Sequence, residues 1–131
     1  MKILIIEDDE TLAGEMASFL VRWGYETHTI RRFDSILEEF REIRPQLVLM
    51  DINLPFYDGF YWCARIRQVS RVPILYISSR SDDRDKIMAM AQGGDDYVEK
   101  PFHLDLLKAK IQAILRRTYE YKVKEQIVLG D

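Results

Sequence analysis

The apolar residues of this chain form short runs that alternate five times with longer periodic stretches. Residues 2–6, 47–50 and 74–77 are near-continuous apolar runs of strand length. Such runs are typical of strands buried on both faces of a parallel sheet. Residues 27–30 and 97–99 are more polar or shorter, which suits the edges of a sheet. The pattern therefore predicts five parallel strands.

Between these runs, apolar residues recur at helical spacing. The first such stretch contains Leu12, Met16, Phe19, Leu20 and Trp23. We expect its stripe of Met16, Phe19 and Trp23 to face the core, with Asp9 capping the helix and Gly24 ending it. Further helices are predicted between Asp34 and Pro45 and over residues 60–69, 85–92 and 104–119. Five strand–helix units joined by short loops predict a doubly wound α/β fold with right-handed crossovers.

The last residues break this pattern. Residues 126–130 (QIVLG) resemble one more short strand with no helix after it. Such a strand is either part of a tail or the start of a second domain. We favour the second interpretation.

Composition narrows the class of protein. The chain has 131 residues, 47% hydrophobic and 31% charged, with a net charge of -3. This size fits one domain, and the negative charge argues against direct nucleic-acid binding. The single Cys63 favours a reducing compartment. No apolar run is long enough to span a membrane, so we expect a cytoplasmic protein without membrane contact.

Charged or hydroxyl side chains that could take part in catalysis or metal binding follow four of the predicted strands. In chain order they are Glu7 and Asp8, then Asp51, then Ser78, then Lys100. Carboxyl ends of parallel strands lie at one edge of the sheet, so these groups should converge there. The neighbouring Asp58–Gly59 pair by itself indicates only a turn.

The converging charges indicate phosphoryl transfer. Carboxylates held within a few ångströms repel one another unless a cation lies among them, and oxygen ligands of this kind suit Mg²⁺. Lys100 and Ser78 could contact the oxygens of an incoming phosphoryl group. Asp51, next to the metal, is placed to be the nucleophile that forms an acyl phosphate.

These residues also carry a family resemblance. The segments ILIIEDD, LVLMDINLPFYDGF, VPILYISSR and GGDDYVEKPF resemble the receiver domain of bacterial two-component response regulators over residues 2–117. The resemblance implies the CheY-like, flavodoxin-like sheet with strand order 2-1-3-4-5. It implies that Asp51 is phosphorylated by a sensor histidine kinase. It also implies Mg²⁺ bound by Asp8, Asp51 and the backbone carbonyl of Asn53, with Glu7 completing the acidic pair.

The same resemblance assigns a switch. Ser78 matches the hydroxyl switch residue, Tyr97 the aromatic switch residue, and Lys100 the lysine that contacts the phosphoryl group. The Lys100–Pro101 peptide bond is expected to be cis, which proline tolerates. Many relatives have threonine where this chain has Ser78, so switching should persist but less sharply.

The segments GGDDYVEKPF and ILRR…VLGD further resemble the OmpR/PhoB subfamily. The resemblance implies a receiver domain over residues 1–119. Residues 120–131 would then be a linker and the start of a missing winged-helix domain, through which alone the protein would contact DNA. The segment FYDGFYWC is similar to the branch that controls bacitracin and antimicrobial-peptide resistance.

Subfamily resemblance also implies a homodimer on phosphorylation. The face would be built from the fourth helix, fifth strand and fifth helix. Asp96 would pair with Lys110, and Asp95 with Arg117, across the two-fold axis. The acid expected opposite Lys86 is replaced by Leu106. The implied interface residues are Lys86, Ile87, Met90, Asp95, Asp96, Lys110 and Arg117.

Three other classes fit less well. A haloacid-dehalogenase-type hydrolase needs a second acid two residues after the nucleophile, where this chain has Asn53. A flavodoxin-like nucleotide or flavin binder needs a phosphate loop after the first strand, and residues 7–10 are all acidic there. A degenerate receiver used only for binding would lack Asp51, the acidic pair or Lys100.

Overall fold

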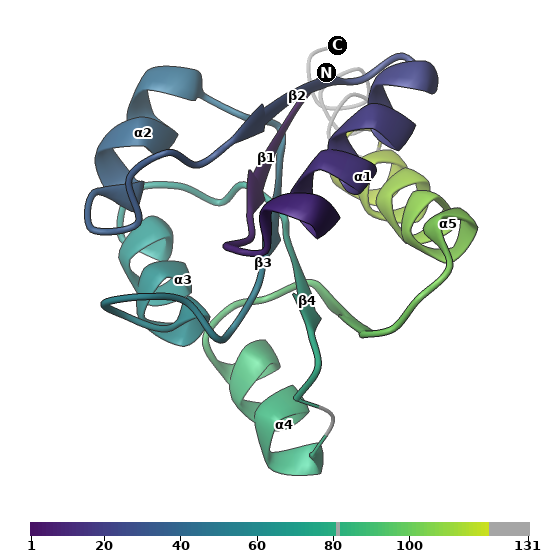
Figure 1. Ribbon diagram of the computed structural model, residues 1–131. Coiled ribbons are helices and arrows are strands. Elements are labelled where there is room, and N and C mark those ends of the chain that lie inside the picture. Colours follow the sequence, from purple (N-terminus) through teal and green to yellow (C-terminus); the bar gives the residue numbers. More distant parts are fainter. Residues whose placement is uncertain (81, 121–131) are drawn as a thin grey trace, which may run out of the picture.

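The computed structural model describes residues 1–80 and 82–120 as a five-stranded parallel sheet with helices on both faces (Figure 1). The sheet has the order β2-β1-β3-β4-β5. Both the fold class and the expected strand order are confirmed. Its strands are β1 (Lys2–Ile6), β2 (Glu26–Thr29), β3 (Leu47–Met50), β4 (Ile74–Ser78) and β5 (Asp96–Glu99).

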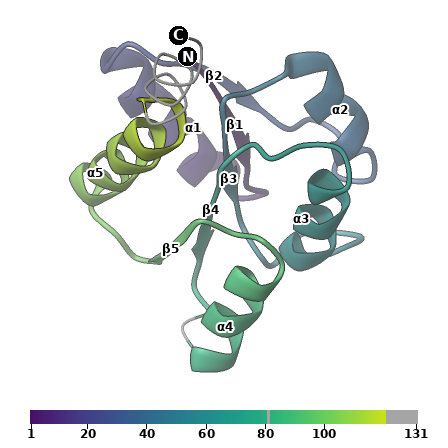
Figure 2. The same ribbon diagram turned by 180° about the vertical axis from the view of Figure 1, so that it is seen from behind.

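Five helices cover the sheet, α1 and α5 on one face and α2, α3 and α4 on the other (Figures 1 and 2). A π-helical turn, Arg116–Glu120, follows α5. No helix in the described part of the chain is long and apolar enough to cross a membrane. The helices are α1 (Glu10–Arg22), α2 (Ile36–Ile43), α3 (Gly59–Arg67), α4 (Asp83–Ala91) and α5 (Leu104–Leu115).

The sheet separates two apolar cores because successive side chains of a strand point to opposite faces. In β1, Ile3 and Ile5 pack under α1 and α5, whereas Leu4 and Ile6 pack under α2 and α3. The helices differ in how much they contribute to these cores. α4 buries only Ala89, the smallest contribution of any of the five helices.

The first helix has the predicted ends. Asp9 Oδ1 accepts a hydrogen bond from the Leu12 N–H at 3.2 Å, as an N-cap does. Gly24 has a φ of +92°, a backbone conformation that glycine adopts without strain.

The prediction that Trp23 belongs to the core is wrong. Met16 is fully buried, but Trp23 is 54% exposed, and Phe19 is only partly buried. The helix ends at Arg22, so Trp23 lies beyond its last turn and outside the buried stripe. The Lys108 ammonium nitrogen lies 3.3 Å from the centre of the Trp23 ring, a cation–π contact.

Two further expectations are refined. The fourth helix begins at Asp83 rather than residue 85, because Asp82 caps it by accepting from the Arg84 N–H at 2.9 Å. The α-helical part of the last helix ends at Leu115, short of residue 119. The strand predicted at 126–130 lies outside the described residues.

Candidate functional site

The strand ends bring the predicted groups to one edge of the sheet. Glu7 and Asp8 directly follow β1, and Asp51 follows β3, whose register pairs Ile6 with Met50. Ser78 is the last residue of β4, and Lys100 directly follows β5. This register fixes how close the side chains come to one another.

Lys100 lies between two buried carboxylates. Its Nζ is 3.0 Å from Asp51 Oδ2 and also makes an ion pair with Glu7 Oε1. The other Asp51 oxygen, Oδ1, accepts the Ile52 N–H at 2.7 Å. Glu7 and Asp51 are each only 4% exposed, so both charges depend on these partners rather than on water.

Three carboxylates lie close enough to share a cation. Glu7, Asp8 and Asp51 each offer an oxygen, and these oxygens lie within 4.8 Å of one another. Asp8 is exposed, so the group opens to solvent on that side. Lys100 supplies a single positive charge against three negative ones. An all-oxygen, partly open set with excess negative charge fits Mg²⁺. The contribution of the Asn53 carbonyl stays a prediction.

The crowding changes the protonation of Glu7. The pKa of Glu7 is raised to about 7: burial is the largest cause, the contacts with Asp51 add to it, and the hydrogen bond from Lys100 opposes both. Burial alone would lower the pKa of Lys100, but its hydrogen bonds to Glu7 and Asp51 outweigh this and raise it. Lys100 therefore stays charged at neutral pH, whereas Glu7 is only partly ionised.

We expect Mg²⁺ affinity to be pH-dependent near neutrality. Protonation of Glu7 removes one negative charge from the cluster, so a Glu7 pKa of about 7 should make binding about fivefold to tenfold weaker at pH 6 than at pH 8. Isothermal titration calorimetry at the two pH values measures the change. Glu7→Gln should flatten the dependence. Equal affinities of the parent at pH 6 and pH 8 would contradict the assignment.

The two predicted switch residues both bond to the backbone of one residue, Arg80. Ser78 is fully buried, and its Oγ accepts the Arg80 N–H at 3.2 Å. The Tyr97 ring is also buried, and its hydroxyl donates to the Arg80 carbonyl. Ser78 and Tyr97 are therefore linked through the backbone of Arg80.

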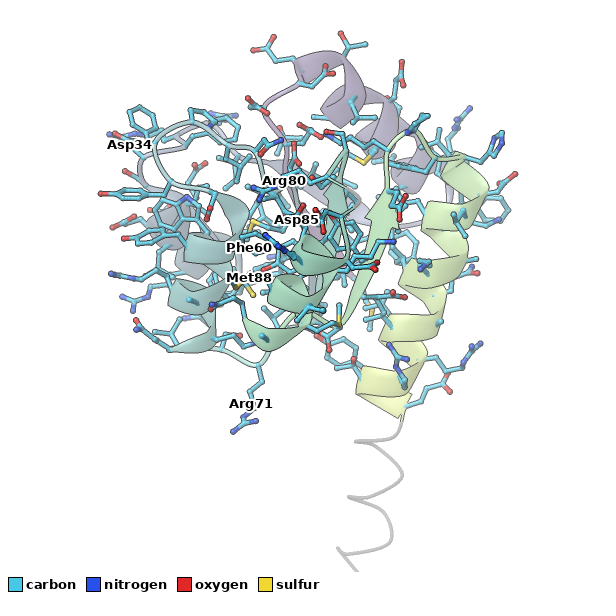
Figure 3. The ribbon with its side chains drawn as sticks, turned by 90° about the horizontal axis from the view of Figure 1, so that it is seen from below. Asp34, Phe60, Arg71, Arg80, Asp85 and Met88 are labelled. Carbon is cyan, nitrogen blue, oxygen red and sulfur yellow. The ribbon has the colours of Figure 1, made fainter. Side chains whose placement is uncertain are left out.

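The Arg80 side chain connects two helices. Its Nη2 lies 2.6 Å from Asp85 Oδ1 on α4. Its guanidinium carbon lies 5.5 Å from the centre of the Phe60 ring on α3. Figure 3 shows Arg80 together with Phe60 and Asp85. The position of α4 is thus tied to the loop that follows Ser78.

Gly59 is a site residue that the pattern of the sequence did not reveal. Asp58 Oδ1 caps α3 by accepting the Tyr61 N–H at 2.9 Å, and the Gly59 N–H donates to the Ile52 carbonyl at 2.8 Å. A Cβ at Gly59 would lie 2.2 Å from the Asp51 carbonyl oxygen. The absence of a side chain lets α3 start directly against the backbone of Asp51. An Asp-Gly pair in sequence indicates a turn, and no local signal reports this close approach.

A cavity of about 520 Å³ opens beside Lys100. Its lining includes Asp9 and Leu12 of the α1 region, Ser79 after β4, and Pro101 and Leu104 after β5. The Lys100–Pro101 bond is cis, as expected. Lys100 itself lines this cavity, whereas its partners Glu7 and Asp51 do not.

Three of the charges assigned to a dimer interface, those of Lys86, Asp96 and Lys110, are paired within the chain. Asp96 Oδ1 lies 3.2 Å from Lys110 Nζ, and Lys86 makes an ion pair with Glu99. The partner predicted for Asp96 is thus already its neighbour on the same subunit. Ile87 and Met90 are 68% and 44% exposed, as an apolar contact spot would require.

Asp95 is held by a cluster that involves Arg67. Asp95 Oδ2 lies 3.1 Å from Arg67 Nη2 and accepts the Ile74 N–H at 2.8 Å. Arg67 also donates to the carbonyls of Gly93 and Val72, at 2.7 and 2.6 Å. A cross-axis pair between Asp95 and Arg117 would have to form alongside these contacts or replace them.

Comparison with known proteins places this geometry among signalling proteins. Residues 3–112 match the family model described as the response regulator receiver domain. The chain is 47% identical to the response regulator protein GraR of Staphylococcus haemolyticus over 130 residues, 99% of this chain and 58% of the relative. It is 50% identical to the sensory transduction protein BceR of Halalkalibacterium halodurans over 120 residues, 92% of this chain and 52% of the relative.

Solved structures agree with this. The N-terminal domain of the nisin resistance regulator NsrR is similar with a TM-score of 0.81 and 43% identity, over 88% of this chain and 97% of that domain. A two-component response regulator from Clostridium difficile has a TM-score of 0.87 and 33% identity, over 91% of this chain and 98% of that structure. The chain spans only about half the length of the curated relatives it matches.

Proposed function

Because this chain belongs to the response regulator receiver domain family, we propose that Asp51 accepts a phosphoryl group from a sensor histidine kinase. The observation that carries the proposal is the placement of Asp51, which is buried, 3.0 Å from Lys100, and within a cluster of three carboxylates. On this proposal residues 1–119 form the receiver domain.

The transfer requires little covalent chemistry from the protein. A carboxylate oxygen of Asp51 attacks the phosphorus in line, the new O–P bond forms, and the P–N bond to the donor histidine breaks. The imidazole nitrogen leaves with the electron pair and takes up a proton. Mg²⁺ held by Asp8 and Asp51 would neutralise charge on the phosphoryl oxygens. Lys100 then moves from a carboxylate partner to the phosphoryl group, so its charge stays paired.

Labelling with a small acyl phosphate tests this directly. The parental chain incubated with acetyl phosphate and Mg²⁺ should gain the mass of one phosphoryl group, and peptide mapping should place it on residue 51. Chelation of Mg²⁺ should remove the gain. Modification at another residue, or equal labelling without metal, would contradict the proposal.

Phosphorylation would be read out by Ser78 and Tyr97. The Ser78 hydroxyl would turn toward the phosphoryl group and give up its bond from the Arg80 N–H, while the Tyr97 hydroxyl is bonded to the carbonyl of the same residue. The Arg80 side chain passes that change to α4 through Asp85. These contacts differ between the two states, and only such differences can shift an equilibrium.

We further propose a symmetric dimer through α4, β5 and α5. Exposed Ile87 and Met90 would supply the apolar contact, and Asp96 and Lys110 would exchange their pairing from within the chain to across the axis. Each pair would occur twice in a two-fold interface. Exposed ion pairs contribute only about 0–1 kcal/mol each, so they would set register rather than hold the dimer.

Mixing two single variants distinguishes a pairing of Asp96 with Lys110 across the two-fold axis from a pairing within one chain. Asp96→Lys and Lys110→Asp should each weaken the phosphorylated dimer in sedimentation velocity runs. An equimolar mixture should recover it, because both cross-axis pairs in the mixed dimer are again of opposite charge. If the pair acts only within one chain, mixing brings no recovery. That result would contradict the proposed interface.

The wider role rests on the relatives. One similar structure is named for a nisin resistance regulator, and we propose that this chain is the receiver part of a cytoplasmic transcriptional regulator of antimicrobial-peptide resistance. The DNA-binding part would be a winged-helix domain beginning near residue 122, after a linker that starts at residue 120. Of that segment, residues 121–131 lie outside the described residues.

A further inference from the structure

The loop between β3 and α3 directly follows Asp51 of the candidate site (Figure 1). It carries an exposed aromatic side chain. Phe56 is 75% exposed and lies five residues after Asp51. The Tyr57 N–H donates to the Pro55 carbonyl at 3.0 Å across Phe56, whose φ is +70°. Phe56 is therefore the central residue of a γ-turn with positive φ, which is a rare and strained conformation.

Folding alone does not account for phenylalanine at this position. A bulky side chain in the left-handed region is disfavoured, whereas asparagine or glycine would adopt the same backbone more easily. Because the ring buries little surface, it contributes little hydrophobic stabilisation to the fold. A strained residue with an exposed aromatic ring points to a use outside the folded chain.

The residues that follow Phe56 form a cluster of aromatic rings at the start of α3. The Tyr57 ring is 51% exposed and stacks on Tyr61 with 4.1 Å between ring centres. The buried Trp62 ring makes a T-shaped contact with the Tyr57 ring, with 5.8 Å between ring centres. The turn is thus fixed on the first turns of α3, so Phe56 is presented in a defined place.

The position of the loop identifies its partner. Asp51 is 4% exposed, so a protein that delivers a phosphoryl group must cover the edge of the sheet and the loop directly after Asp51. Residues 52–57 carry no charge, and three of their exposed side chains, Pro55, Phe56 and Tyr57, offer a mainly apolar contact. We propose that Phe56 is an anchor that inserts into an apolar recess on the phosphodonor domain of the sensor kinase, a role that rests on the proposed function.

Two phosphodonors of different size test the anchor. Phe56→Asn should change labelling by acetyl phosphate less than twofold, because that donor is too small to reach the turn. Transfer from a kinase should fall about tenfold or more in its second-order rate constant, as is typical for loss of an aromatic anchor. The kinase is the purified cytoplasmic domain, among those of the source organism, that labels the parental chain fastest.

Matched variants separate docking from folding. Phe56→Asn should melt at the same temperature as the parent or higher, because asparagine relieves the turn. Phe56→Tyr should keep most of the kinase rate. So should Val69→Ala, which removes an exposed apolar side chain just after the C-terminal end of α3.

Three results would overturn the anchor. They are an unchanged kinase rate in Phe56→Asn, an equal fall with both donors, or a weakened phosphorylated dimer with normal kinase transfer. The last would assign the ring to a second copy of the chain. Failure of the parental chain to take up acetyl phosphate on Asp51 would instead contradict the proposed function.

Discussion

Asp51→Asn should abolish phosphorylation by acetyl phosphate and by a kinase. An amide nitrogen or oxygen is a poor nucleophile. We expect neither neighbouring carboxylate to replace Asp51, because Glu7 is engaged by Lys100 and Asp8 is assigned to the metal. The fold should survive, since asparagine keeps the size of the side chain and an oxygen to accept the Ile52 N–H. Mass spectrometry of the intact chain should show no phosphoryl gain. The melting temperature should be equal or higher, because the repulsion among the three carboxylates is relieved while Lys100 keeps its pair with Glu7.

Asp34→Asn is the matched control for that variant. Asp34 is an exposed aspartate in the loop between β2 and α2, and Figure 3 shows it at the margin of the molecule. The same chemical change there should leave labelling unaltered. Any label retained by Asp51→Asn, or lost by Asp34→Asn, would show that another residue accepts the phosphoryl group.

Gly59→Ala should unfold or strongly destabilise the chain. The added Cβ would lie 2.2 Å from the Asp51 carbonyl oxygen and 3.0 Å from Ile52 Cα, both backbone atoms that cannot move aside cheaply. Overpacking against a side chain costs about 1–3 kcal/mol, and we expect a clash with backbone to cost about 3 kcal/mol or more. Any folded fraction should be labelled slowly, because the clash displaces Asp51.

Gly14→Ala, the same substitution at another glycine, should stabilise the chain instead of destabilising it. Gly14 lies within α1, and a Cβ there meets nothing within 4 Å. Alanine should therefore raise the free energy of unfolding by about 0.5–1 kcal/mol, since glycine is a poor residue inside a helix. Urea denaturation of both variants measures the contrast. Equal effects at the two glycines would show that space beside Asp51 is not limiting.

The sheet and the charged centre of the site follow from sequence patterns for physical reasons. Apolar runs mark β1, β3 and β4 because both faces of those strands are buried. Parallel strands place their carboxyl ends together, so the approach of Asp51 to Lys100 could be predicted without coordinates.

Other features depend on distances between segments that no local pattern encodes. The exposure of Trp23 depends on the residue at which α1 stops, one position before the ring. Two contacts join residues that are separated in sequence. They are the close approach of Gly59 to Asp51 and the ion pair between Arg67 and Asp95. The pairing of Asp96 with Lys110 within one chain was likewise not predictable, because a pattern of charges does not specify whether the partner lies on the same subunit.

The single buried residue of α4 has a consequence for local stability. Most of the free energy that holds a helix in place comes from its buried apolar face, and α4 offers only the methyl group of Ala89. Its attachment is therefore weak compared with that of α5, which buries Leu107, Ile111, Ile114 and Leu115. Regions with few buried contacts open at a small fraction of the global unfolding free energy. On the proposed function, we therefore expect a rearrangement of one or two hydrogen bonds at Arg80 to move α4 before any better-anchored helix.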